Sequence, residues 1–234
     1  ESRFNLPPHP LQEIVDDLDP DDSNTRLVVA ESETGSGKTE AALNWFCKLF
    51  IAGKVDSLYF ALPTRVAARE LYGRINETIK SWFPDPDCRP VTLLAVPGYE
   101  QIDGQSVQRL VPDAQTANLW QDDQEALFLE RHWAGAMPKR FLAATVAVGT
   151  IDQALFSIVQ AGHAHLRSVC LDRSLLVVDE VHASDLYMSS LLRSLLTHHL
   201  GVGGYAMLLS ATLGSRARNE YIQLTEPDTV LPDL

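Results

Sequence analysis

The fold of this 234-residue chain is decided by the stretch Arg26-Leu27-Val28-Val29-Ala30-Glu31-Ser32-Glu33-Thr34-Gly35-Ser36-Gly37-Lys38-Thr39. A short apolar run, typical of a buried strand, leads into a glycine-rich loop, and a helical apolar repeat follows. This order of strand, loop and helix is the context that a phosphate-binding loop needs. The glycines let backbone N–H groups turn towards phosphate oxygens, and the N-terminus of the next helix adds partial positive charge.

Two side chains of this loop carry specific chemistry. Lys38 is expected to reach the β- and γ-phosphates, and the hydroxyl of Thr39 is expected to bind Mg²⁺. Ser32 stands where the strict pattern has glycine, which is its least demanding position. The loop therefore predicts a nucleoside triphosphate and Mg²⁺ as cofactors.

Apolar runs and helical repeats alternate along the rest of the chain. Because the runs lack an alternating polar face, we expect an α/β fold with a mostly parallel sheet and helices on both of its faces. On the helix after the loop, the spacing predicts a buried face of Leu43, Phe46, Cys47, Phe50 and Ile51. The expected strands cover residues 26–30, 57–62, 91–96, 142–148, 175–178 and 205–209, and further helices cover residues 65–82, 151–159 and 188–199.

A second motif, Asp179-Glu180-Val181-His182, follows a continuous apolar run. Ligands of parallel sheets bind beyond the carboxyl ends of the strands, and two adjacent carboxylates there are costly without a cation. Asp179 is therefore expected to hold Mg²⁺, and Glu180 to orient and deprotonate the attacking water. A third motif, Ser210-Ala211-Thr212, ends another apolar strand and has little specificity alone.

Composition narrows the class of protein. Hydrophobic residues make up 45% and charged residues 21%, which excludes a disordered chain. The net charge of −12 shows that the chain lacks the bulk basic charge of many nucleic-acid-binding proteins, which weakens the case for binding by overall charge. Binding through backbone amides and a few placed side chains is still compatible with it. No apolar run is long enough to span a bilayer, so we expect neither a transmembrane helix nor a membrane as a partner. Three separated cysteines without metal-ligand spacing favour a reducing cytoplasm.

The order of the motifs carries a resemblance. The glycine-rich loop, Pro63-Thr64-Arg65, Gly149-Thr150, the acidic motif and Ser210-Ala211-Thr212 together resemble the first motor domain of a superfamily 2 helicase. Three longer stretches, residues 37–43, 148–155 and 179–188, resemble the CRISPR-associated helicase-nuclease of type I interference systems. In that family the motor hydrolyses ATP and moves along single-stranded DNA, while a separate HD domain cuts it.

The resemblance implies a RecA-like P-loop NTPase fold and assigns roles to individual residues. Gln12 resembles the glutamine that reads adenine; the alternative is an exposed residue at the start of a helix. The implied catalytic residues are Lys38, Asp179 and Glu180, with Mg²⁺ on Thr39 and Asp179. The implied ATP-binding residues are Gln12, Thr34, Gly35, Ser36, Gly37, Lys38, Thr39 and Glu40. The implied nucleic-acid contacts are Thr64, Arg65, Gly149, Thr150 and Gln153, and the implied coupling residues are His182, Ser210 and Thr212.

The resemblance also suggests a domain organisation. We expect an N-terminal helix with an adenine-reading segment over residues 1–25, and the first motor domain over residues 26–234. An irregular insertion is expected at about residues 97–139, with a helix at 122–132. No His-Asp dipeptide and no motif of a second motor domain occurs, so we expect both domains elsewhere, on the same or another chain.

The expected partners are single-stranded DNA, a second RecA-like domain, an HD nuclease domain and a CRISPR effector complex. Two alternatives stay open on the sequence alone. One is the motor domain of another superfamily 2 RNA or DNA helicase. The other is a nucleotide-dependent docking module without turnover of its own.

Overall fold

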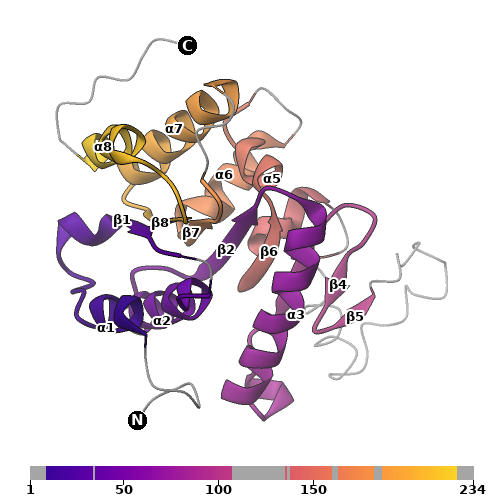
Figure 1. Ribbon diagram of the computed structural model, residues 1–234. Coiled ribbons are helices and arrows are strands. Elements are labelled where there is room, and N and C mark those ends of the chain that lie inside the picture. The colour runs from indigo at the N-terminus through magenta and orange to yellow at the C-terminus, as the bar shows by residue number, and fades with distance from the viewer. Residues whose placement is uncertain are drawn as a thin grey trace.

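The computed structural model describes residues 9–33, 35–106, 135, 138–159, 163–181 and 186–225. Within these ranges the strands form one sheet (Figure 1). The first six strands in its spatial order run parallel, and an antiparallel hairpin extends one edge. The order is β1 (Leu27–Glu31), β8 (Tyr205–Ser210), β7 (Ser174–Val178), β2 (Ser57–Leu62), β6 (Val146–Thr150), β3 (Thr92–Ala95), β4 (Gln101–Ile102) and β5 (Gln105–Ser106).

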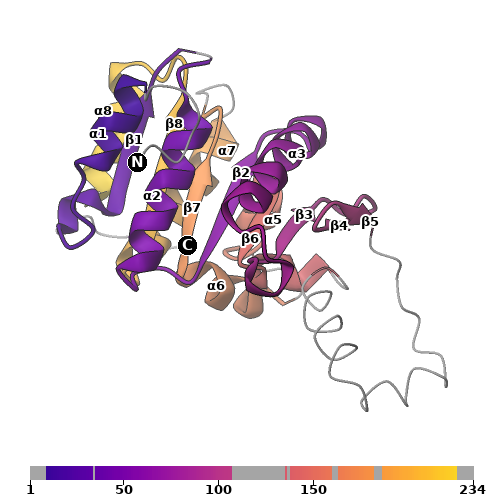
Figure 2. The same cartoon turned by 90° about the horizontal axis from the view of Figure 1, so that it is seen from below.

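Helices cover both faces of this sheet. One face carries α1 (Pro10–Asp16), α2 (Lys38–Ile51) and α3 (Arg65–Trp82), which lie in front of the strands in Figure 2. The other face carries α5 (Ile151–Leu155), α6 (Ala164–Asp172), α7 (Leu186–Gly201) and α8 (Ser215–Ile222). Short 3₁₀ segments are η1 (Ser23–Arg26), η2 (Pro86–Cys88), η4 (Pro138–Ala143) and η5 (Gln223–Thr225).

Strand β2 shows why this sequence needs two covering layers. Leu58 and Phe60 pack into the core beneath α2 and α3, whereas Tyr59 and Ala61 pack into the core on the opposite face. Successive side chains of a strand point to opposite faces, so an apolar run buries both faces. The expected α/β fold with a mostly parallel, doubly covered sheet is confirmed.

Some expected strands and helices have the predicted first and last residues, and others do not. Strand 57–62 and helix 65–82 have the predicted bounds. The strand expected at 142–148 is wrong in its first half, because η4 reaches Ala143 and β6 begins at Val146. Phe141 and Leu142 are still buried, and an apolar pattern alone does not distinguish a short helix from a strand.

The predicted buried face of α2 is partly wrong. Phe50 and Ile51 are 49% and 76% exposed, whereas Trp45 and Leu49 are fully buried. Phe50 and Ile51 line an apolar cavity of about 340 Å³ with residues that include Trp82 of α3. The last two predicted core residues of the helix therefore face this open cavity and not the buried core.

The described part of the N-terminal segment packs on the motor fold. Val15 of α1 is buried in the core. Lys48 Nζ of α2 donates hydrogen bonds to the carbonyl oxygens of Asp16 and Leu18, the latter at 2.7 Å. The Tyr205 hydroxyl of β8 donates to the carbonyl oxygen of Pro20 at 2.9 Å. Residues 1–8, and within the expected insertion residues 107–134 with its helix 122–132, lie outside the described residues.

Candidate functional site

The carboxyl ends of the parallel strands gather the sequence motifs on one edge of the sheet. Along that edge, β1, β8 and β7 carry the glycine-rich loop, Ser210-Ala211-Thr212 and Asp179-Glu180. The neighbouring strands β2 and β6 carry Thr64-Arg65 and Gly149-Thr150. Two strand spacings, about 10 Å, separate the strands behind the glycine-rich loop and the acidic pair. We call the part of the edge at β1, β8 and β7 the nucleotide half and the part at β2 and β6 the nucleic-acid half, after the ligands that their sequence motifs predict.

The glycine-rich loop folds tightly around the start of α2. Gly37 caps the helix with φ +79°, a conformation that side chains rarely adopt, and its carbonyl oxygen accepts the N–H of Ala41 at 2.9 Å. The Ser36 hydroxyl donates to the carbonyl oxygen of Glu33 at 2.7 Å. Lys38 Nζ donates to the carbonyl oxygen of Ser32 at 2.7 Å, so the amine reaches back across the loop. Thr34 lies outside the described residues.

Gln12 lies directly against this loop. A Cβ placed on Gly37 would come within 2.4 Å of Gln12 Nε2, and Gln12 is 7% exposed. Its Oε1 accepts the backbone N–H of His9 at 3.1 Å. The alternative of an exposed residue at a helix start is therefore wrong, and the adenine-reading role stays a prediction.

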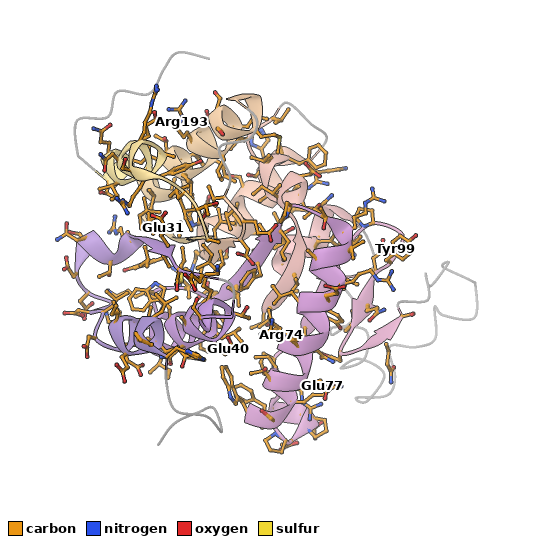
Figure 3. The ribbon with its side chains drawn as sticks, in the orientation of Figure 1. Glu31, Glu40, Arg74, Glu77, Tyr99 and Arg193 are labelled. Carbon is orange, nitrogen blue, oxygen red and sulfur yellow. The ribbon has the colours of Figure 1, made fainter. Side chains whose placement is uncertain are left out.

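The side chain of Glu40 points to α3. Its Oε1 lies 2.9 Å from Nη2 of Arg74, and Figure 3 shows the two residues on neighbouring helices. The contact joins the first turn of α2 to the middle of α3. Glu40 follows Lys38 and Thr39 in the sequence and is expected to bind ATP with them. In the structure, however, its carboxylate forms an ion pair with Arg74 of α3.

The acidic segment after β7 is held by both neighbouring strands. The N–H of Asp179 donates to the carbonyl oxygen of Ala61 in β2 at 2.9 Å, and that of Val181 to Leu209 in β8 at 3.2 Å. Between them Glu180 has φ +55°, a conformation that costs a non-glycine residue roughly 1–2 kcal/mol. The Glu180 N–H donates to Oδ1 of Asp179 at 2.9 Å. His182 lies outside the described residues.

The Ser210-Ala211-Thr212 segment contacts the glycine-rich loop. The carbonyl oxygen of Ser210 accepts the N–H of Ser32 at 3.0 Å, and the Ser210 Oγ accepts the N–H of Thr212 at 3.1 Å. Ser210 is 2% exposed, whereas Thr212 is exposed. The backbone of this segment therefore bridges the loop after β1 to the turn that precedes α8.

Glu31 opens the glycine-rich motif, but no pattern in the sequence assigns it a role. Its Oε1 accepts the N–H groups of Leu213 at 3.1 Å and Gly214 at 3.3 Å. The only available signal was a carboxylate at the end of an apolar strand, which identifies no partner. Contacts this distant along the chain follow from strand order and not from local pattern.

The expected nucleic-acid residues divide into exposed and buried groups. Thr64 and Arg65 are exposed, and Thr64 Oγ1 caps α3 by accepting the N–H of Ala67 at 3.2 Å. Thr150 and Gln153 are only 6% and 7% exposed, and Gln153 Oε1 is buried without a hydrogen-bond partner among the described residues. The exposed pair is thus the more accessible to a ligand.

Close packing alone explains why residue 149 is glycine. A Cβ at this position would lie 2.5 Å from the Tyr59 hydroxyl and 2.7 Å from the carbonyl oxygen of Ala95. The Tyr59 hydroxyl donates to the carbonyl oxygen of Thr150 at 2.8 Å. Close packing between β2, β6 and β3 therefore requires glycine here, whether or not a ligand contacts it.

The oxygen donors of the nucleotide half fit Mg²⁺. Within the part of the chain that the structure describes, no cluster of three or more His, Cys, Asp or Glu residues could hold a metal ion. Mg²⁺ is commonly bound by one or two protein ligands together with substrate phosphates. The Thr39 hydroxyl and the Asp179 carboxylate suit that arrangement. Among the described residues no helix is both long and apolar enough to cross a membrane.

The chain has clear relatives among known proteins, although no family model matches it. It is 33% identical over 216 residues to the CRISPR-associated endonuclease/helicase Cas3 of Escherichia coli K12, covering 92% of this chain and 23% of that protein. The corresponding protein of Thermus thermophilus is 30% identical over 92% of this chain and 23% of its own length. The chain thus spans about a quarter of these relatives.

Solved protein structures are also similar to this chain. T. fusca Cas3 with AMPPNP matches with a TM-score of 0.68 and 28% identity, over 94% of this chain and 23% of that one. A chain in a CRISPR RNA-guided surveillance complex, pre-nicking, matches with a TM-score of 0.61 and 27% identity, over 93% of this chain and 20% of that one. The ordered motifs, the doubly covered parallel sheet and these similarities identify the chain as homologous to the first motor domain region of the Cas3 helicase-nucleases.

Proposed function

We propose that this chain is the ATP-binding first motor domain of an ATP-dependent translocase that moves along single-stranded DNA in CRISPR interference. The observation that carries the proposal is the shared sheet edge, where the nucleotide motifs adjoin Thr64 and Arg65. Similarity to Cas3 proteins, one of them with a bound ATP analogue, supports it.

ATP is proposed to lie across the glycine-rich loop and the N-terminus of α2. Backbone N–H groups and Lys38 would hold its phosphates, with Gln12 on the adenine. Thr39 and Asp179 would hold Mg²⁺, which when bound offsets phosphate charge. Glu180 would accept the proton of the attacking water. Thr34 and Glu40 remain proposed contributors.

Single-stranded DNA is proposed to bind over the start of α3. Thr64 and Arg65 suit contacts to the sugar-phosphate backbone, which carry no sequence information. Gly149, Thr150 and Gln153 would form the adjoining part of this track. Movement is proposed to depend on His182, Ser210 and Thr212. The hydrogen bonds of Asp179 to β2 and of Val181 to β8 support such coupling, because they link the acidic segment to both halves of the edge.

The intact protein is proposed to contain or bind further domains. The relatives are named as both endonuclease and helicase and are about four times longer. An HD nuclease domain, a second RecA-like domain and a CRISPR effector complex are the proposed partners, and the cytoplasm the proposed location. Elsewhere an arginine finger from a partner contributes about 10³–10⁵ in rate, so we expect this chain alone to hydrolyse ATP slowly.

The test is ATP turnover by the full-length protein with single-stranded DNA, RNA or duplex DNA. The proposal expects the largest stimulation by single-stranded DNA. Preferential stimulation by RNA would favour another superfamily 2 helicase. Tight ATP binding without turnover under any of these conditions would favour the docking module.

A further inference from the structure

A hydrogen-bonded turn places an exposed tyrosine next to the nucleic-acid half of the edge. Directly after β3 the chain reads Val96-Pro97-Gly98-Tyr99. The N–H of Tyr99 donates to the carbonyl oxygen of Val96 at 3.0 Å, and Gly98 has φ +86°. Proline followed by a glycine with positive φ is the signature of a type II turn. The turn fixes Tyr99 beyond the end of β3, the strand that neighbours Gly149-Thr150 of β6.

Tyr99 is exposed and lies beneath a cation. Its exposed fraction is 53%, and the guanidinium carbon of Arg69 lies 5.3 Å from the centroid of its ring. Figure 3 shows Tyr99 at the periphery, beside the upper part of α3. Tyrosine with arginine over its face is a combination on which unpaired bases stack.

A groove adjoins this pair. It encloses about 400 Å³ between the first turns of α3 and the strands β3 and β4. Its lining residues are Val66, Arg69, Glu70, Leu94 and Gln101. The Glu70 carboxylate disfavours a phosphate in the groove, whereas a carboxylate can accept a hydrogen bond from an N–H group of a base. The groove therefore suits a base rather than the DNA backbone.

The helix connects this groove to the proposed backbone contacts. Arg65 and Arg69 are four residues apart on α3, so they lie on the same side of the helix. We infer that Tyr99 and Arg69 form a stacking site for one unpaired nucleobase, next to the phosphate contacts of Thr64 and Arg65. This inference rests on the proposed binding of single-stranded DNA and adds the position where a base is held.

The first experiment measures binding of the full-length protein to a fluorescent oligothymidylate by anisotropy. Tyr99→Ala should weaken binding about 5- to 150-fold, the range for stacking of one base on an aromatic side chain. Tyr99→Phe should bind like wild type because it keeps the ring. Phe83→Ala should also bind like wild type, because Phe83 is an exposed aromatic residue at the opposite end of α3.

The second experiment separates stacking from charge. Arg65→Ala should lower the dependence of binding on salt by about one released counterion, whereas Tyr99→Ala should leave that slope unchanged. On an oligonucleotide of abasic residues, wild type and Tyr99→Ala should bind equally. In Tyr99→Trp, bound oligothymidylate should quench the new indole fluorescence relative to a Phe83→Trp control.

Distinct results overturn the inference. If Arg65→Ala loses affinity but Tyr99→Ala does not, the stacking site is wrong and the proposed function stands. Equal losses in Tyr99→Phe and Tyr99→Ala would also refute stacking, since the ring is then not what binds. If the wild-type protein does not bind single-stranded DNA, the proposed function and the stacking site are both wrong.

Discussion

Glu31 and Arg218 are joined by an ion pair, with Glu31 Oε2 3.0 Å from Arg218 Nη1, across 187 residues of sequence. Glu31 ends the strand that leads into the glycine-rich loop, and Arg218 lies in α8 (Figure 3 labels Glu31). Because Oε1 of Glu31 also accepts the N–H groups of Leu213 and Gly214, this one side chain ties the start of the glycine-rich loop to the segment after Ser210-Ala211-Thr212.

Replacing Glu31 should destabilise this junction. Glu31→Ala removes the acceptor of two N–H groups, so the free energy of unfolding should fall by about 1 kcal/mol. Glu31→Gln keeps an acceptor oxygen and should lose less. Arg218→Ala breaks only a partly exposed ion pair and should change stability by less than about 1 kcal/mol. Urea denaturation measures these values. Arg193→Ala is the control, because it breaks the ion pair between Arg193 of α7 and Glu220, which lies on α8 like Arg218. Equal stability of Glu31→Ala and wild type would contradict the bridging role.

Lys38→Ala should weaken binding of ATP with Mg²⁺. Hydrogen bonds to charged groups contribute about 1.5–3 kcal/mol, so affinity should fall roughly 10- to 150-fold. Titration calorimetry measures it. Lys54→Ala is the matched control, because Lys54 pairs with Asp21 at 2.6 Å, away from the loop. An unchanged affinity in Lys38→Ala would refute the phosphate-loop assignment.

Substitutions of the two acidic residues, Asp179 and Glu180, should affect different steps. In the full-length protein, Glu180→Gln should still bind ATP but lose turnover by about 10²- to 10⁴-fold, because it removes the general base. Asp179→Asn should instead weaken the Mg²⁺-dependent part of ATP binding. Phosphate release and calorimetry separate these effects. Glu77→Gln, which breaks an exposed pair with Lys80 on α3, is the control. Normal turnover of Glu180→Gln would remove Glu180 from the mechanism.

Two glycine variants should have opposite effects. Gly37→Ala is strained at φ +79° and its new methyl group meets Gln12 Nε2, so stability and ATP affinity should both fall. Gly73→Ala lies within α3, and beyond the helix's own adjoining backbone no atom of the described residues lies within 4 Å of the new Cβ. It should stabilise the protein by about 0.5–1 kcal/mol, since alanine favours a helix interior over glycine. Thermal denaturation compares the pair, and a Gly37→Ala variant as stable as Gly73→Ala would contradict the contact.

His199 should make stability depend on pH. Burial lowers its pKa below the ordinary 6.5, while its Nε2 lies 3.0 Å from the carbonyl oxygen of Tyr205. Below pH 6.5 the unfolded chain therefore binds a proton that the folded chain does not, so stability falls as pH falls towards the lowered pKa. The slope from this one group is at most about 1.4 kcal/mol per pH unit.

Urea denaturation between pH 5 and 8 measures this dependence. His199→Gln should be flatter than wild type over the window below pH 6.5. His198→Gln changes an exposed neighbour on the same helix and serves as control. A His199→Gln curve parallel to that of wild type would show that His199 does not carry the pH dependence.

Local pattern in the sequence determined the elements and the main motifs of this protein. Strand 57–62 and helix 65–82 follow from runs and repeats whose periods match a single kind of element. The glycine-rich loop is equally local, because the glycines, Lys38 and the start of the helix are contiguous. The prediction of a strand at 142–148 is wrong in its first half, because a short apolar run is compatible with more than one backbone conformation.

Tertiary structure alone decided which of these pieces meet. The spatial order of the strands brings Glu31 to Arg218, and the packing of α1 on α2 brings Gln12 against Gly37. Tertiary structure likewise leaves Phe50 and Ile51 exposed and sets Tyr99 beneath Arg69. Hydrophobic periodicity indicates only which face of an element is buried. The partners of a side chain depend on how the whole sheet is ordered, and this order is set by packing between segments distant in sequence.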